Sequence, residues 1–81
     1  MKELYPCYDN RQSFYGKAKV DESGNVKKLY SYGTHVASIV DGKAEVYGWY
    51  SNTTGRHIKE FLKQNGFWAV SKEQILKDYL V

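Results

Sequence analysis

The chain has 81 residues, of which 42% are hydrophobic and 16% aromatic, and it contains one cysteine, Cys7. This length predicts one domain, residues 1–81, around one core, and a lone cysteine excludes an internal disulfide and argues against a thiolate zinc site. The formal net charge of +3 would tolerate a polyanionic partner but is low for a dedicated duplex binder.

No segment approaches the roughly 18 consecutive apolar residues of a membrane span, and the start of the chain lacks the apolar run of a signal peptide. A lone cysteine is typical of proteins kept in a reducing cytosol. We therefore expect a cytoplasmic protein without a membrane association, metal or cofactor, in which Cys7 is inert.

The N-terminal half has the composition and alternation of β-strands. Leu4–Tyr8 predicts an edge strand or an extended lead-in, because its proline has no N–H for a neighbouring strand. Phe14–Val20 alternates as a strand does, and Asp21–Asn25 is a turn cluster. Val26–Val40 predicts one long extended segment, rich in Tyr, Val and Thr, with a bend or bulge at Gly33.

Asp41-Gly42 is the strongest local signal, since it is typical of a two-residue type I′ loop between two strands. The second strand is predicted over Ala44–Tyr50. This register places small and apolar residues on one face, which we expect to be the core face: His35, Ala37, Ile39, Ala44, Val46 and Gly48. The opposite face is aromatic and polar: Thr34, Val36, Ser38, Val40, Glu45, Tyr47 and Trp49. Continued alternation adds Lys28, Tyr30 and Tyr32 to this face, unless a bulge at Gly33 reverses the register.

Two helices are predicted in the remainder. Ser51–Thr54 supplies N-cap residues for an amphipathic stretch that ends at Asn65-Gly66. After an apolar connector or short strand at Phe67–Val70, Ser71 with Gln74 forms a capping box that opens a second helix. Strands followed by helices predict an α+β fold: a four-stranded antiparallel meander, or five strands with the N-terminal edge, and two C-terminal helices packed on one face.

The start of the first helix is a candidate anion site. This helix start would place hydroxyls and positive charge beside free backbone N–H groups, where a phosphate is favoured. The residues concerned are Thr53, Thr54, Arg56 and His57. The alternative is an ordinary helix cap with a solvated arginine. A small enzyme acting on nucleotides or phosphodiesters would use His35 and His57 together, but the sequence places no nucleophile with them. The alternative for His35 is a hydrogen-bonded position in the core.

The aromatic face is a second candidate. Tyr30, Tyr32, Tyr47 and Trp49, with lysines 17, 19, 27 and 28 nearby, would offer stacking surfaces and charge to single-stranded nucleic acid. The same rings would serve as anchors of a protein interface or homodimer. The remaining alternative is that the rings only pack against one another across the sheet and bind nothing.

Two motifs resemble small proteins of bacteriophages and other mobile elements. The run Ser31-Tyr32-Gly33-Thr34-His35-Val36-Ala37 matches a Ser-Tyr-x-Thr-x-Val-Ala strand, and Tyr50–Leu62 matches a Tyr-Ser-x-Thr-Thr-x-x-His-Ile-x-x-Phe-Leu helix start. The resemblance covers about the middle half of the chain and points to uncharacterised domains. It implies a shared site at Thr53–His57 and a non-enzymatic binding module that contacts nucleic acid or a host protein, the alternative being an interaction or homodimerisation domain.

Overall fold

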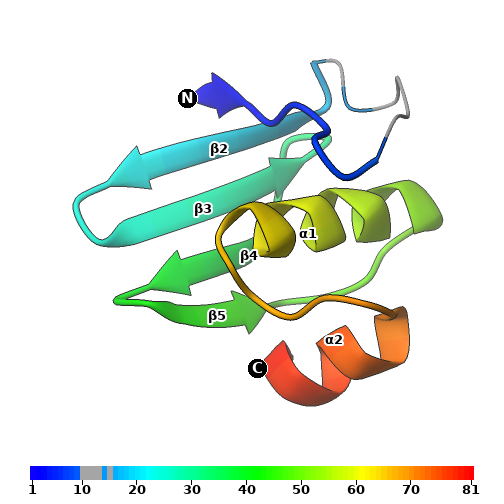
Figure 1. The fold of residues 1–81 in the computed structure, drawn as a ribbon. Helices are drawn as coiled ribbons and strands as arrows, with labels where there is room; N and C mark the ends of the chain where they lie inside the picture. Colours follow the sequence, from blue (N-terminus) through cyan, green and yellow to red (C-terminus); the bar gives the residue numbers. More distant parts are fainter. Residues whose placement is uncertain (10–13, 15) are drawn as a thin grey trace.

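The structure, a computed structural model, describes residues 1–9, 14 and 16–81. Within them, five strands form an antiparallel sheet in chain order, and two helices follow (Figure 1). The elements are β1 (Lys2–Glu3), β2 (Ala18–Ser23), β3 (Val26–Ser31), β4 (Thr34–Val40), β5 (Lys43–Val46), α1 (Asn52–Gln64) and α2 (Lys72–Tyr79). The predicted α+β meander is confirmed, and β1 is its fifth strand.

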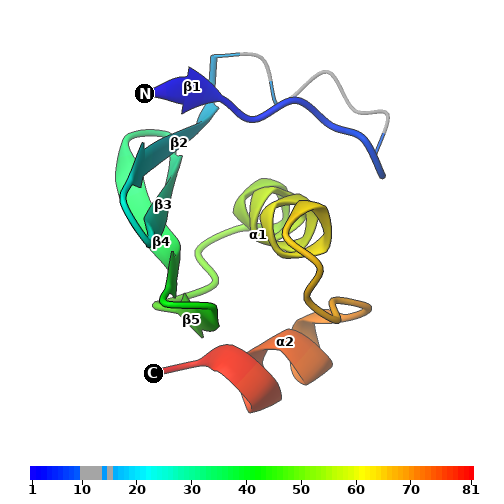
Figure 2. The ribbon, with the colours of Figure 1, turned by 60° about the vertical axis from the view of Figure 1, so that its left-hand side comes forward.

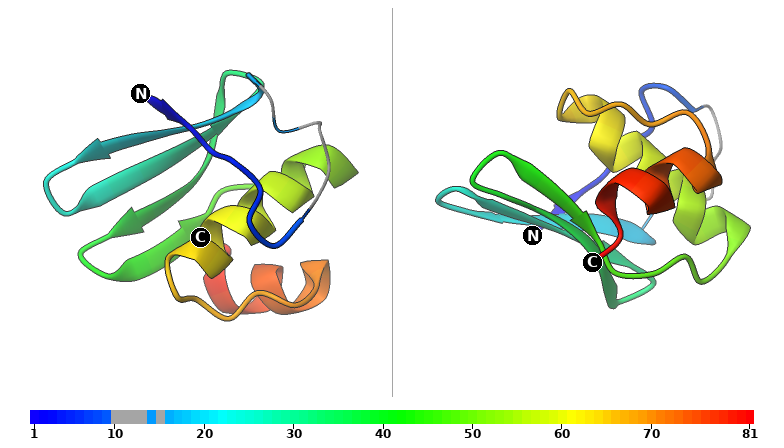
Figure 3. Two further views of the ribbon diagram at one scale, coloured as in Figure 1. Left: turned by 45° about the horizontal axis from the view of Figure 1, so that its top comes forward. Right: turned by 90° about the horizontal axis from the view of Figure 1, so that it is seen from below.

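Both helices lie on one face of the sheet (Figure 2). α1 packs across β3 and β4, whereas α2 lies beside β5, as the view from below in Figure 3 shows. Leu80 forms a parallel bridge with Val46, and the backbone N–H of Val81 donates to the Val46 carbonyl at 3.1 Å. We call the opposite face, which carries neither of the two described helices, the outer face. None of the described helices is long and apolar enough to cross a membrane.

The core lies between the sheet and the helices. Its buried apolar residues come from every described element except β1, and also from the segments before β2 and before α2: Leu4, Phe14, Ala18, Leu29, Val36, Ala37, Ile39, Ala44, Val46, Ile58, Phe61, Leu62, Ala69 and Ile75. The predicted core positions Ala37, Ile39, Ala44 and Val46 are among them. Burial of this apolar surface is the main force that holds the helices on the sheet.

The N-terminal segment pairs earlier than the sequence predicts. β1 is Lys2–Glu3, so of the two predictions for Leu4–Tyr8 the edge strand is wrong beyond Leu4, whose N–H donates to the Ala18 carbonyl at 2.9 Å. Beyond this point the chain leaves the sheet edge and runs to α1 (Figure 1). The proline in this segment is therefore not required to pair with a strand.

A buried carboxylate holds this segment against α1. The side chain of Glu60 is only 1% exposed and accepts hydrogen bonds from the backbone N–H groups of Cys7 and Tyr8, both at 2.9 Å. Gln64 Nε2 donates to the same carboxylate at 2.6 Å and to the Tyr5 carbonyl at 2.7 Å. These bonds satisfy a charge that would otherwise be costly to bury.

Two hairpins have the same backbone conformation at their turns. Asp41 and Gly42 have φ values of 51° and 77°, as expected for the predicted type I′ loop. Tyr32 and Gly33 have φ values of 53° and 81°, so the chain reverses there as well. The prediction of one extended segment over Val26–Val40 is therefore wrong. Its cause is a tyrosine at a position where Asn, Asp or Gly is the usual signal.

A bulge in β4 changes which residues face the core. Leu29 pairs with Ala37, but Tyr30 pairs with His35, so Val36 is an additional residue on β4. As a result Val36 is fully buried in the core, while His35 lies with Tyr30 on the outer face. The predicted faces of His35 and Val36 are both wrong, because alternation was counted through the bulge.

Other element boundaries also move. β2 begins at Ala18 instead of Phe14 and continues through Ser23, which shortens the predicted turn cluster; Tyr15 lies outside the described residues. The predicted strand Ala44–Tyr50 ends at Val46, and Phe67–Val70 forms a connector without a strand. The helix predictions are confirmed. The hydroxyls of Ser51 and Ser71 accept the N–H groups of Thr54 and Gln74 at 3.1 Å, and Gly66 has a φ of 82° after α1.

Candidate functional site

A row of aromatic rings crosses the outer face. Tyr30 on β3 and His35 on β4 are a cross-strand pair whose ring centroids lie 5.2 Å apart. The ring of Tyr47, just after β5, lies 4.9 Å from that of His35 in an edge-on arrangement. On the other side of Tyr30, the cross-strand partner is Lys19 of β2. We call Lys19, Tyr30, His35 and Tyr47 the aromatic row.

His35 occupies the middle of this row and is half-buried. Its Nε2 lies 2.7 Å from the hydroxyl of Ser38, which is buried beneath the row. Burial lowers the pKa of His35 below its ordinary value of 6.5, and the nearby charge of Lys28 lowers it further, while a hydrogen bond with the Ala37 backbone acts in the opposite direction. Both effects favour the neutral form of His35, which offers a flat ring to the row.

A hollow of about 340 Å³ adjoins the end of the row. Its charged and aromatic lining consists of Lys17, Lys19, Tyr30 and Tyr32, and Met1, Gly16 and Gly33 complete it. Lys17 Nζ lies 5.6 Å from the centroid of the Tyr32 ring, a cation–π distance. The N–H of Tyr32 donates to the Lys17 carbonyl at 2.8 Å, which fixes the turn against the entry to β2. The hollow therefore combines two rings and two cations.

The aromatic residues that the sequence places on one face are divided among three locations. Tyr30 and Tyr47 lie on the outer face, and Tyr32 lies at the turn that borders the hollow. The prediction for Trp49 is wrong, because its ring packs against the core and the first turn of α1. A Cβ added at Gly55 would lie 2.1 Å from Cζ2 of Trp49, so the glycine makes room for the indole.

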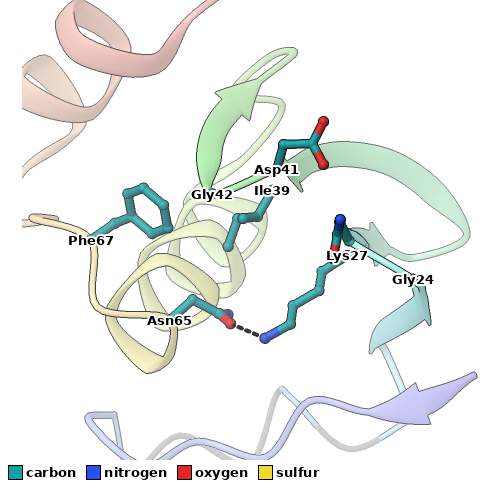
Figure 4. A pocket seen from close by; sticks show the side chains of 8 residues that line it. Gly24, Lys27, Ile39, Asp41, Gly42, Asn65 and Phe67 are labelled. Carbon is teal, nitrogen blue, oxygen red and sulfur yellow. Dashed lines mark hydrogen bonds between the residues drawn. The ribbon is translucent and has the colours of Figure 1, made fainter.

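The predicted lysines are divided as well. Lys28 is exposed on the outer face, whereas Lys27 pairs with Ile39 on the helix side of the sheet. There Lys27 Nζ lies 2.6 Å from Oδ1 of Asn65, the C-cap residue of α1, across an open cleft of about 690 Å³ (Figure 4). A cation at the carbonyl end of a helix is favoured by the helix dipole. Lys27 therefore interacts with the end of α1 and does not contribute a positive charge to the outer face.

The helix start does not bring the four predicted anion-binding residues together. Thr54 and His57 are buried on the side of α1 that faces the sheet, where Ser31 Oγ lies 3.0 Å from Thr54 Oγ1 and 2.8 Å from His57 Nδ1. Thr53 and Arg56 are half-buried and lie about a hundred degrees around the helix from that pair. The cap itself is Ser51.

The two histidines are also separated by the sheet. His57 is fully buried between the sheet and α1, with its ring 4.7 Å from that of Phe14, whereas His35 lies on the outer face. A joint acid–base site of His35 and His57 is therefore not formed. Within the described residues, no group of three or more His, Cys, Asp or Glu is placed to hold a metal ion.

Sequence reasoning missed two features of this surface. His35 enters the aromatic row only because of the bulge, for which the sequence carries no distinct signal. The Tyr32-Gly33 turn, which forms the hollow, could have been found from its glycine between two β-rich runs. The lysines at the hollow, Lys17 and Lys19, were expected near the rings.

These features define a small antiparallel sheet domain with helices on one face and an aromatic outer face. The chain belongs to DUF8033, a family of unknown function, whose sequence pattern matches residues 2–77. No curated protein and no solved structure matches the chain. The family match extends well beyond the middle half on which the resemblance to uncharacterised domains depends. The phage or mobile-element origin stays a prediction.

Proposed function

We propose that this chain is a non-enzymatic binding module that contacts single-stranded nucleic acid with its outer face. The observation that carries the proposal is the position of the hollow at the end of the aromatic row. Rings for base stacking and cations for phosphates then occur side by side, as single-strand binding requires. Lys19 and Tyr30 belong to both features.

The magnitudes favour stacking over charge as the main source of affinity. A base stacked on an aromatic ring contributes about 1–3 kcal/mol, and Tyr30 and Tyr47 offer two such rings. Among the described residues, the lysines that border the hollow are Lys17 and Lys19, and Glu3 is the cross-strand partner of Lys19. Two phosphate contacts would give a log–log salt slope of about −1.4, and hence a loss of roughly seven-fold between about 50 and about 200 mM salt.

A protein interface is the alternative use of this face. Tyrosines are common anchors of interfaces, and no helix covers the outer face in the described structure (Figure 2). A homodimer through Tyr47 would appear in sedimentation as a mass that depends on concentration. The adjacent cations favour nucleic acid, because the core of a protein interface is depleted of charge. The resemblance to small phage proteins agrees with either binding role.

The test is a fluorescence-anisotropy titration of labelled single-stranded DNA and RNA at low and at moderate salt. Tyr47→Ala and Lys19→Gln should each weaken binding, and Lys19→Gln should also reduce the salt slope by about 0.7. Lys77→Gln, on the exposed part of α2, is the matched control and should bind as the wild type does. Absence of binding at low salt, or equal affinity for Lys19→Gln and Lys77→Gln, would contradict the proposal.

A further inference from the structure

A second basic feature lies on α1, on the opposite side of the sheet from the outer face. Arg56, Lys59 and Lys63 follow one another at spacings of three and four residues, which places them on one side of the helix. The N-terminal segment crosses this side at Tyr8 and Asp9, and the two together enclose a hollow of about 70 Å³. We call Arg56, Lys59 and Lys63 the basic stripe.

The carboxylates beside the stripe do not balance its charge. Among the described residues that line the hollow, three cations face two carboxylates, Glu60 and Asp9. Glu60 already accepts hydrogen bonds from two backbone N–H groups and from Gln64, which occupy its oxygens. A dense group of cations with an excess of positive charge attracts a further anion.

The surroundings of the stripe also strengthen its electrostatics. Arg56, Lys59 and Lys63 are each half-buried, so water solvates them less fully than it does the exposed lysines of β2 and α2. Lys63 Nζ lies 5.7 Å from the centroid of the Tyr8 ring, a cation–π contact that restrains its side chain. Charges that are partly removed from water and held in place interact more strongly with a ligand than solvated, mobile ones.

We propose that this hollow is a binding site for a phosphate group. Its volume is far below the about 300 Å³ of pockets that enclose whole small molecules, so it fits a compact anion and no nucleobase. Arg56 supplies the planar fork that matches phosphate oxygens, and Lys59 and Lys63 supply point charges. The site is independent of the aromatic row and does not require the outer face to bind anything.

The experiment is a titration of the whole chain with inorganic phosphate, followed by the backbone amide signals in NMR spectra. Sodium chloride at matched ionic strength is the reference. Phosphate should shift the amides of Tyr8 and of α1 around Lys59 in a saturable way, whereas chloride should not. Arg56→Gln and Lys59→Gln should each weaken the phosphate response by about ten-fold or more, the effect expected for loss of a charge-assisted hydrogen bond.

Two controls keep the result interpretable. Lys77→Gln removes one positive charge from α2 and should leave the phosphate response unchanged, as should Tyr47→Ala on the outer face. Repeating the titration with a short oligonucleotide identifies the source of the phosphate. If the site binds a phosphate of the nucleic-acid backbone, the oligonucleotide should shift the Tyr8 and α1 amides, and Arg56→Gln should reduce this shift. A free or small-molecule phosphate leaves these amides unmoved by the oligonucleotide. No saturable response to inorganic phosphate, or equal responses in Arg56→Gln and Lys77→Gln, would overturn the proposal.

Discussion

The hydroxyl oxygen of Ser31 lies 2.8 Å from Nδ1 of His57, and this contact joins the end of β3 to α1 within the core. The same oxygen lies 3.0 Å from the hydroxyl of Thr54, so one serine satisfies two buried side chains of the helix. The contact fixes α1 beside the turn at Tyr32, whose ring lies 5.8 Å from that of His57. Tyr32 also lines the hollow beside the aromatic row. The buried cluster of Ser31, Thr54 and His57 therefore helps to position a residue of that hollow.

Ser31→Ala should destabilise the fold by about 1–3 kcal/mol, because it leaves two buried polar side chains without this hydrogen-bonding partner. The measurement is the free energy of unfolding from urea denaturation. Ser23→Ala, at an exposed position of β2, is the matched control and should change stability by less than about 0.5 kcal/mol. Equal effects of the two substitutions would show that the cluster does not stabilise the fold.

Gly55→Ala should also destabilise the protein, although alanine is the better helix former by about 1 kcal/mol. The added Cβ would lie 2.1 Å from the Trp49 ring, and the repacking should cost about 1–3 kcal/mol. Urea denaturation measures the loss, and fluorescence in a Trp68→Phe background should report a more exposed Trp49. A stabilising effect would mean that the indole does not occupy this position.

Glu60→Gln should release the N-terminal segment from α1. The amide offers one acceptor oxygen in place of two and no charge, so the bonds from Cys7 and Tyr8 weaken. Hydrogen exchange of these two backbone amides should become faster. Glu73→Gln, on the exposed side of α2, should leave their exchange rates unchanged. Unaltered exchange in Glu60→Gln would contradict the role of the carboxylate.

The pKa of His35 predicts how its contribution to stability depends on pH. Because burial holds this pKa below the ordinary value of 6.5, the unfolded chain takes up a proton at a higher pH than the folded chain does. Between the two pKa values the unfolded state binds more protons, so the free energy of unfolding decreases as the pH falls below 6.5. Urea denaturation over a pH series should show a weaker decrease for His35→Gln. Parallel pH profiles for the two proteins would contradict this assignment.

The order and type of the elements could be predicted from local signals. Asp41-Gly42 predicts the register of the hairpin of β4 and β5. Ser51 is one of the four residues predicted to cap α1, and Ser71 is the predicted cap of α2. Each of these signals satisfies a local requirement, either a left-handed turn conformation or the free N–H groups of a helix start, within a few residues of the chain. The turn at Tyr32 was missed because a tyrosine occupies a left-handed position where Asn, Asp or Gly is the usual signal.

The candidate site was harder to predict than the fold. Tyr47 continues the alternation of β5, whereas His35 depends on a bulge and Trp49 on the space that Gly55 leaves. At the helix start, Thr54 and His57 carry polar groups that suit an anion and suit Ser31 equally well. The packing of α1 on β3 decides between these two partners. Such packing depends on both segments, so it cannot be predicted from the sequence of either one alone.

The central claim is that single-stranded nucleic acid binds the outer face, and mapping the contact by NMR tests it most directly. Addition of an unlabelled oligonucleotide to isotope-labelled protein should shift the amides of Lys17, Lys19, Tyr30, His35 and Tyr47 as one saturable set. The amides of α2 should not move. Shifts confined to the helices, or no saturable shift at low salt, would contradict the account.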